Sequence, residues 1–433
     1  MTAEVAILNK LGVALAADST VTITTSNGDK TYNTTNKLFT LSKYHPVGMM
    51  IWNATDFNTV PFELIIKEFR ESLGRDSKNH LGDYADLFIR HLRARAHVGK
   101  AEQLVNFRSL LGDYCRSLRR DFFGVCRELQ IDVPIGATLS GDARNVFNEI
   151  LDSFEEKVIS EGKNKNLRGV SARQLSSAYS GVADDAITRV LNPIRPTLAQ
   201  KGQLISLLHQ AALSNLLTDN FTGLVFAGYG NKQYYPSIIE HRTDGMFANR
   251  LKLSNRRTAE VVRENPAMMA PFARREAANL FMEGVDHSYQ DEIDNSIHDL
   301  LVGMADVSAK YFGASNARKI DRFRSRLRQL AANHALALRS LRYKEVKRVL
   351  DAVEFLDKSE MALLAENLVS LTALKQKISL ETETVGGPID VAFISKNDGF
   401  IWIKRKHYFD GKLNPFFFDK YLTGTNARMG RGP

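Results

Sequence analysis

The first 54 residues alternate between short apolar runs and polar turns, which is typical of β-strands. An Asn27-Gly28 pair is a strong hairpin signal within this stretch. Some runs are almost continuously apolar, which predicts sheets covered on both faces. The expected strands are residues 5–8, 13–16, 21–24, 37–41 and 47–52.

Apolar residues recur with helical spacing over residues 60–218 and again over 257–375. Strand-like runs return at residues 222–246 and 389–403. Segregated blocks of strands and helices favour the α+β class, with helices layered on sheets. The expected organisation is six segments, namely N-terminal strands (1–59), a helical insertion (60–218), strands (219–256), helices including a basic helical insertion (257–375), C-terminal strands (376–410) and a polar tail (411–433).

The composition is that of a globular protein, with 44% hydrophobic and 25% charged residues. Only two cysteines occur, Cys115 and Cys126, which excludes a disulfide-rich scaffold. They lie eleven residues apart, so we expect both thiols to be buried on one face of a helix. No apolar run reaches the length of a membrane span and no signal peptide is recognisable. We therefore expect a cytoplasmic protein that does not bind a membrane.

The formal net charge of +9 is concentrated in one segment, because residues 315–350 hold eleven basic and two acidic residues. An apolar stripe through this segment predicts an amphipathic helix. Its basic side is either a solvated face, the commoner case, or a docking surface for nucleic acid or an acidic partner. The arginines that would serve a nucleic-acid interface are Arg318, Arg322, Arg324, Arg326 and Arg328.

Residues 286–306 hold six acidic residues and no Lys or Arg, so this helix is expected to pair with the basic one within the chain or across a subunit contact. Four of its side chains share one helix face: His287, Asp291, Asp294 and His298. His and Asp are ligands for zinc or iron, but no His-Glu-x-x-His or Glu-x-x-His pattern accompanies them. We expect neither a metal nor another cofactor.

Thr2 is the sharpest chemical feature, because removal of Met1 would make it the first residue. A free N-terminal threonine combines a hydroxyl nucleophile with an α-amine of pKa about 7.7–8.0, which can accept the hydroxyl proton at neutral pH. Thr2 alone is a weak signal, since threonine is common at this position.

The stretch from Thr2 to Ser19 resembles the opening of proteasome β-subunits and their bacterial homologues, which are N-terminal nucleophile (Ntn) hydrolases. Those chains begin with the mature threonine, form a strand, a glycine turn and a second strand, and then reach an Asp-Ser or Asp-Gly pair. Here Asp18 follows Thr2 at an offset of 16 residues, as in the family. The strand at 36–41 is similar to the family's catalytic-lysine strand, and the next one leads to its oxyanion turn, here residues 48–54. The resemblance covers residues 2–57 well and residues 222–246 and 365–405 more loosely.

The resemblance implies a role for each matching residue. Thr2 attacks the carbonyl with its own amine as base. The ammonium of Lys37 lies beside Thr2, keeps that amine neutral and stabilises developing negative charge. Asp18 holds Lys37, and the backbone N–H near Asn53 stabilises the oxyanion. Asn is tolerant of the positive φ that the family's glycine adopts there.

The same resemblance implies substrate contacts from Thr22, which aligns the substrate main chain, and a first specificity pocket lined by Val21, Ile51 and Thr55. The family's late Asp and Ser are not matched before Gly386-Gly387, where the sequence reads Glu381-Thr382-Glu383-Thr384-Val385. Glu381 and Glu383 are candidates to replace that acid.

The fold implied is a four-layer αββα sandwich with two long helical insertions. The implied activity is hydrolysis of amide bonds in peptides or unfolded protein by a homo-oligomer. Two other classes stay open, a non-catalytic scaffold subunit of the same fold and a protein that binds nucleic acid or an acidic partner through residues 315–350.

Overall fold

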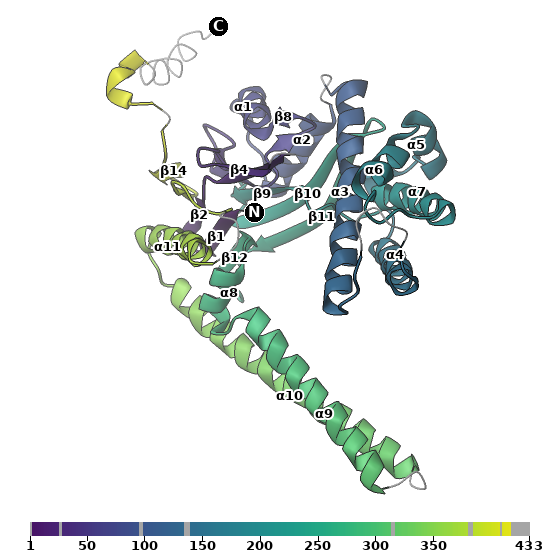
Figure 1. The fold of residues 1–433 in the computed structure, drawn as a ribbon. Helices are drawn as coiled ribbons and strands as arrows, with labels where there is room; N and C mark the ends of the chain where they lie inside the picture. The colour runs from purple at the N-terminus through teal and green to yellow at the C-terminus, as the bar shows by residue number, and fades with distance from the viewer. Residues whose placement is uncertain are drawn as a thin grey trace.

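Two five-stranded antiparallel sheets form the centre of the molecule (Figure 1). The computed structural model describes residues 2–25, 28–94, 98–133, 139–312, 317–379, 384–407 and 409–416. The first sheet has the order β12-β1-β2-β13-β14 and the second the order β11-β10-β9-β6-β5. The class α+β expected from the segregated strands and helices agrees with this architecture.

The strands of the first sheet are β1 (Ala3–Asn9), β2 (Gly12–Ala17), β12 (Ala267–Ala273), β13 (Asp390–Ser395) and β14 (Gly399–Lys404). Those of the second are β5 (Leu38–Thr40), β6 (Val47–Asn53), β9 (Thr222–Gly228), β10 (Ser237–Phe247) and β11 (Arg250–Glu260). Two small hairpins join β3 (Val21–Thr25) to β4 (Gly28–Tyr32) and β7 (Asp56–Phe57) to β8 (Val60–Pro61).

The two sheets pack face to face through a shared apolar core. Leu8 and Leu15 from the first sheet meet Met50 and Val225 from the second in this core. The opposite face of the first sheet, including Ile7, packs against helix α11 (Lys358–Lys377). Because β1 and β2 are therefore buried on both faces, their sequences are almost continuously apolar, as expected.

Helices α1 (Phe62–Leu73) and α2 (Leu81–Arg93) cover the outer face of the second sheet and share its core. The remaining helices of the 60–218 block have a separate apolar core beside the β10–β11 hairpin (Figure 1). The block is thus helical as predicted, but its first two helices belong to the sheet, because their apolar faces complete its packing. The later helices are α3 (Lys100–Glu128), α4 (Gly141–Glu161), α5 (Ala172–Ala178), α6 (Val182–Val190) and α7 (Leu198–Leu213), with a short 3₁₀ turn at Lys165–Leu167.

Local sequence signals fix several helix starts. Thr197 caps the start of α7 in a capping box, in which its hydroxyl accepts from the Gln200 N–H at 3.3 Å and its own N–H donates to Gln200 Oε1 at 2.9 Å. Asp357 and Glu360 repeat this arrangement at the start of α11. Cys115 and Cys126 both lie buried on α3, as expected, and burial raises the pKa of the Cys115 thiol to about 12.

The helical expectation over residues 257–375 is wrong at its start. Strand β11 continues to Glu260, and residues 267–273 form strand β12, which pairs with β1. The apolar run of β12 gave no period-two signal, but it contains Pro271, which disfavours a helix interior and is tolerated at a sheet edge. Strand β12 is that edge strand of the first sheet.

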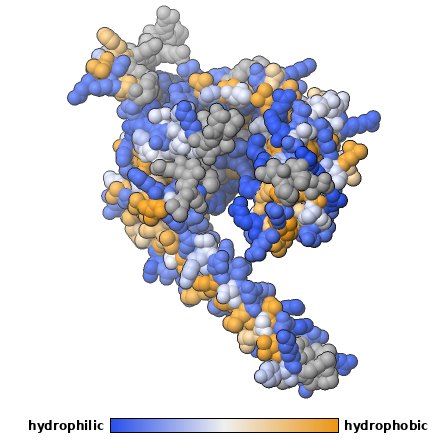
Figure 2. Space-filling model, in the orientation of Figure 1, coloured by the Kyte–Doolittle hydropathy of each residue, from blue (hydrophilic) through white to orange (hydrophobic). Residues whose placement is uncertain are grey.

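After the short helix α8 (Glu276–Glu283), two long helices, α9 (His287–Phe312) and α10 (Ala317–Val353), lie side by side and project away from the sheets (Figure 1). Arg324 on the basic α10 pairs with Asp306 on the acidic α9 at 3.4 Å, so the expected contact between the two helices is confirmed within one chain. Apolar side chains are visible along this pair of helices as well as polar ones (Figure 2). No helix among the described residues has both the length and the apolar character needed to cross a membrane. At the C-terminal end, a 3₁₀ turn covers Gly411–Leu413.

Candidate active site

Thr2 and Glu4 lie on the same face of the first strand, because successive side chains of a strand alternate. Ala6 and Leu8 continue this face into the core between the sheets. Thr2 is only 2% exposed, and its hydroxyl donates a hydrogen bond to Glu4 Oε2 at 3.0 Å. The main chain of Thr2 is anchored by strand β12, since the Arg274 N–H donates to the Thr2 carbonyl at 3.0 Å.

Asp18 and Lys37 meet beside Thr2, as the resemblance implied. The Lys37 ammonium is completely buried and lies 2.5 Å from Asp18 Oδ1, which also accepts from the Ala3 N–H at 3.1 Å. Asp18 Oδ2 accepts from the N–H groups of Thr20 at 3.2 Å and Gly386 at 3.1 Å. Both carboxylate oxygens are therefore held by donors, which fixes the position of Lys37 relative to Thr2.

The Gly386-Gly387 turn is part of the same site. Besides the bond from Gly386 to Asp18, the Gly386 carbonyl accepts from the Ser19 N–H at 3.2 Å, and the Ser19 hydroxyl donates to the Pro388 carbonyl. Gly387 adopts a φ of 69°, a conformation that favours glycine. Glu381 and Glu383, the candidate acids just before this turn, lie outside the described residues.

Asn53 ends strand β6 with a φ of 68°, the positive value expected for an oxyanion turn. Its backbone N–H is directed to Thr2 Oγ1 at 3.5 Å. Its side-chain amide donates to the carbonyls of Asp219 at 2.7 Å and Phe221 at 2.8 Å, which hold the turn in this conformation. A Cβ at Gly223 would lie 1.9 Å from Trp52 Nε1, so glycine is required there for Trp52 to pack next to Asn53.

Glu4 is the site residue that sequence reasoning missed. It is 2% exposed, and its Oε1 accepts no hydrogen bond within the described residues, although Lys37 Nζ lies 3.7 Å away. Burial raises the pKa of Glu4 to about 8, against the opposing effect of Lys37. The available signal was a single acid inside the otherwise apolar or amide-bearing strand Ala3–Asn9.

The four residues expected to contact substrate occupy different environments. Val21 and Thr22 lie half-buried on β3, and the Thr22 hydroxyl has no hydrogen-bond partner among the described residues. Thr55 is half-buried, and its carbonyl accepts from the Phe62 N–H at 2.9 Å. Ile51 is 1% exposed and packs in the core that β6 shares with α1 and α2. Ile51 is thus part of that closed core in this structure.

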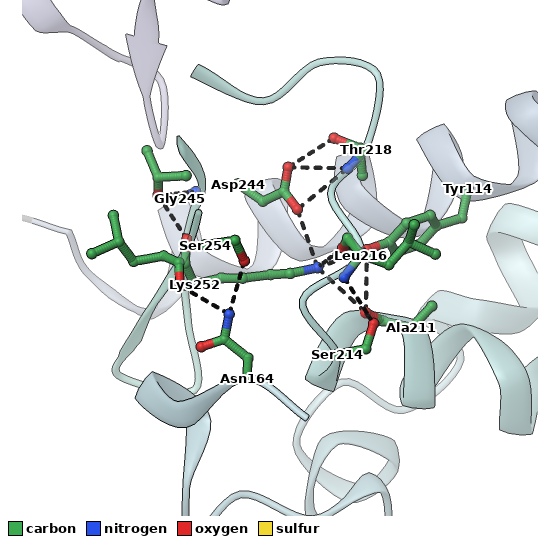
Figure 3. Close-up of polar contacts among 12 residues, drawn as sticks. Tyr114, Asn164, Ala211, Ser214, Leu216, Thr218, Asp244, Gly245, Lys252 and Ser254 are labelled. Carbon is green, nitrogen blue, oxygen red and sulfur yellow. Dashed lines mark hydrogen bonds and ion pairs between the residues drawn. The ribbon is translucent and has the colours of Figure 1, made fainter. Parts of the chain in front are cut away.

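A second buried polar cluster lies around Lys252 and Asp244 (Figure 3). Lys252 on β11 is completely buried and donates to the Tyr114 hydroxyl at 2.7 Å and to the carbonyls of Leu216 and Ala211, while Asp244 lies 3.1 Å away. Asp244 in turn accepts from the Thr218 hydroxyl at 2.9 Å. Burial lowers the pKa of Lys252, opposed by the charge of Asp244.

This cluster fixes the segment that leads into strand β9. Leu216 and Thr218 are held by Lys252 and Asp244, and the next residues along the chain, Asp219 and Phe221, hold the Asn53 amide. The only signals for this cluster in the sequence are a lone lysine and a lone aspartate within the segment expected to form strands.

The other charged candidates lie away from Thr2 on the α9–α10 pair. His287 Nε2 lies 3.1 Å from Glu283 Oε2, and Gln290 donates to Asp294 at 3.0 Å. Across the described ranges, no three His, Cys, Asp or Glu side chains gather as a metal site requires. The arginines of residues 318–328 are on α10.

Comparison with known proteins identifies no relative, since no protein family, no curated protein and no solved structure matches the chain.

Proposed function

We propose that the chain is an N-terminal threonine hydrolase that cleaves amide bonds through an acyl-enzyme on Thr2 after removal of Met1. In this proposal the two packed sheets and their outer helices are the four-layer αββα sandwich of Ntn hydrolases. Peptides or unfolded protein are the substrates, and the active form is a homo-oligomer.

One observation carries the proposal, the convergence of residues distant in sequence on a single hydroxyl. The Thr2 hydroxyl is approached by the Asn53 N–H at 3.5 Å and bonded to Glu4, and the Lys37–Asp18 pair lies directly beside them. A hydroxyl nucleophile, an acceptor for its proton, a fixed cation and a backbone donor for the oxyanion are the parts that acyl transfer requires.

The test is covalent labelling with a β-lactone, which acylates a hydroxyl, combined with intact mass and peptide mapping. Wild type is expected to lose Met1 and to gain the acyl mass at Thr2, while Thr2→Ala stays unlabelled. Thr2→Ser is the matched control, because it keeps the hydroxyl and should be labelled. A folded wild type that stays unlabelled would favour the scaffold alternative. A retained Met1 would leave Thr2 without a free α-amine and would contradict that amine's role as base.

A further inference from the structure

Glu4 has the geometry of a base toward the nucleophile. Its Oε2 accepts the Thr2 hydroxyl proton at 3.0 Å, within the range that proton transfer needs. Thr2 and Glu4 are two residues apart at the start of a strand that is paired on both sides, so the two groups are held rigidly.

Asp18, the other carboxylate of the site, has both of its oxygens already occupied by hydrogen bonds. Its two oxygens accept from Lys37, Ala3, Thr20 and Gly386. Among the described residues, Glu4 instead has one oxygen on Thr2 and one without a hydrogen bond. Of the two carboxylates, Glu4 is therefore the one placed to exchange a proton with the Thr2 hydroxyl.

The electrostatic surroundings of Glu4 favour the same role. The charged and titratable groups that act on it are Lys37, Asp18, the Thr2 hydroxyl and the amino terminus of the chain. Burial raises the pKa of Glu4 to about 8, near the working pH, so its ionised form, which is the base, becomes more populated as pH rises through that value.

We propose that Glu4 is the general base for Thr2, so that activation of the hydroxyl does not require a free α-amine. The proposal rests on the assigned role of Thr2 as nucleophile. It changes which group carries the proton and therefore which N-terminal forms of the chain react.

The proton movements balance without a further reactant. As Thr2 Oγ1 bonds to the substrate carbonyl carbon, its proton passes to Glu4 and the carbonyl electrons move onto the oxygen that faces the Asn53 N–H. Collapse of this intermediate breaks the C–N bond, and Glu4 returns the proton to the leaving amine. Water then loses a proton to Glu4, attacks the ester carbonyl, and releases Thr2 Oγ1, which regains the proton.

Two variants test the role of Glu4 by the rate of β-lactone labelling at Thr2. Glu4→Gln keeps the shape and removes the base, so labelling is expected to slow at least 100-fold while the N-terminal mass is unchanged. Glu4→Asp keeps a carboxylate and should recover part of the rate. Glu240→Gln is the matched control, because Glu240 is also buried but lies on β10, outside the site. A Glu4→Gln rate within threefold of wild type would overturn the proposal.

A second measurement leaves Glu4 itself unchanged and alters only the N-terminus of the chain. In a chain with Gly-Ser in place of Met1, the Thr2 nitrogen is an amide, yet labelling should persist within about tenfold of the processed form. Its rate should rise as pH increases through the titration of Glu4 near 8. Complete loss of labelling in this chain would assign the base to the α-amine and overturn the proposal. Failure of the proposed function looks different, because wild type itself would then be unlabelled, and that result would remove the role of Glu4 as well.

Discussion

Lys37 and Lys252 are both completely buried, each beside an aspartate, yet their surroundings differ. Lys252 has a carboxylate, a phenol and two backbone carbonyls as acceptors, so its charge is matched and its hydrogen-bonding capacity is filled. Lys37 has two carboxylates nearby, and Oε1 of one of them, Glu4, accepts no hydrogen bond from the part of the chain that the structure describes. Under the proposed function, the first arrangement holds the chain in place and the second serves the reaction, because Glu4 beside Lys37 can change its protonation.

Replacing each lysine by methionine gives the largest expected effects. Lys252→Met leaves Asp244 and three neutral acceptors buried without their donor, so we expect the free energy of unfolding to fall by about 3–5 kcal/mol. Lys37→Met should cost less than half as much, because the Asp18 carboxylate keeps its hydrogen bonds from the Ala3, Thr20 and Gly386 N–H groups. It should still slow labelling of Thr2 at least 100-fold.

Urea denaturation and labelling rates measure the two effects on the same variants. The exposed Lys347→Met is the control for loss of a lysine and should change neither. Equal stability losses at Lys37 and Lys252 would show that both lysines are structural and would remove the contrast.

The sequence predicts the strands, and Asp18 and Lys37 as members of the site, better than it predicts the contacts that hold the site together. Short apolar runs locate β1, β2, β6 and β9, and the resemblance of residues 2–57 brings Asp18, Lys37 and Asn53 to Thr2. Strand β12 was missed, because an apolar run without alternation does not distinguish a strand from a buried helix.

Glu4 and Lys252 could not be predicted for a related reason. A single charged residue in a strand is usually solvated, and only tertiary packing shows that these two are buried. The residues that enclose Glu4 and Lys252 come from distant parts of the chain, such as the 211–218 segment around Lys252. A single sequence does not reveal those contacts.

The pH dependence of stability gives a second test of the contrast between Lys37 and Lys252, because Glu4 lies beside Lys37 only. The pKa of Glu4 rises from 4.5 to about 8 on folding, so the folded state binds more protons than the unfolded state between these values. The contribution of Glu4 protonation to the free energy of unfolding is therefore complete below pH 4.5 and is lost as pH rises through 8. Between pH 5 and 8, wild type should lose roughly 3 kcal/mol more than Glu4→Gln in the free energy of unfolding.

Urea denaturation of both proteins at several pH values measures this difference. Parallel curves for wild type and Glu4→Gln would mean that Glu4 titrates alike in both states.

The smallest expected effect lies at Asn53, where the two clusters meet. Alanine at this position loses the amide that holds the Asp219 and Phe221 carbonyls and is forced to a positive φ, so Asn53→Ala should lower the free energy of unfolding by about 1–2 kcal/mol. Asn53→Gly loses the same amide bonds without the φ cost, and should be less destabilised. Both variants keep the backbone N–H that faces Thr2, so labelling should slow about tenfold in Asn53→Ala and less in Asn53→Gly. Because both variants lose the same amide bonds, equal slowing in Asn53→Gly and Asn53→Ala would show that the φ value does not limit the position of the oxyanion donor. The slowing would then be assigned to the lost bonds to residues 219 and 221, in the segment that Lys252 and Asp244 hold.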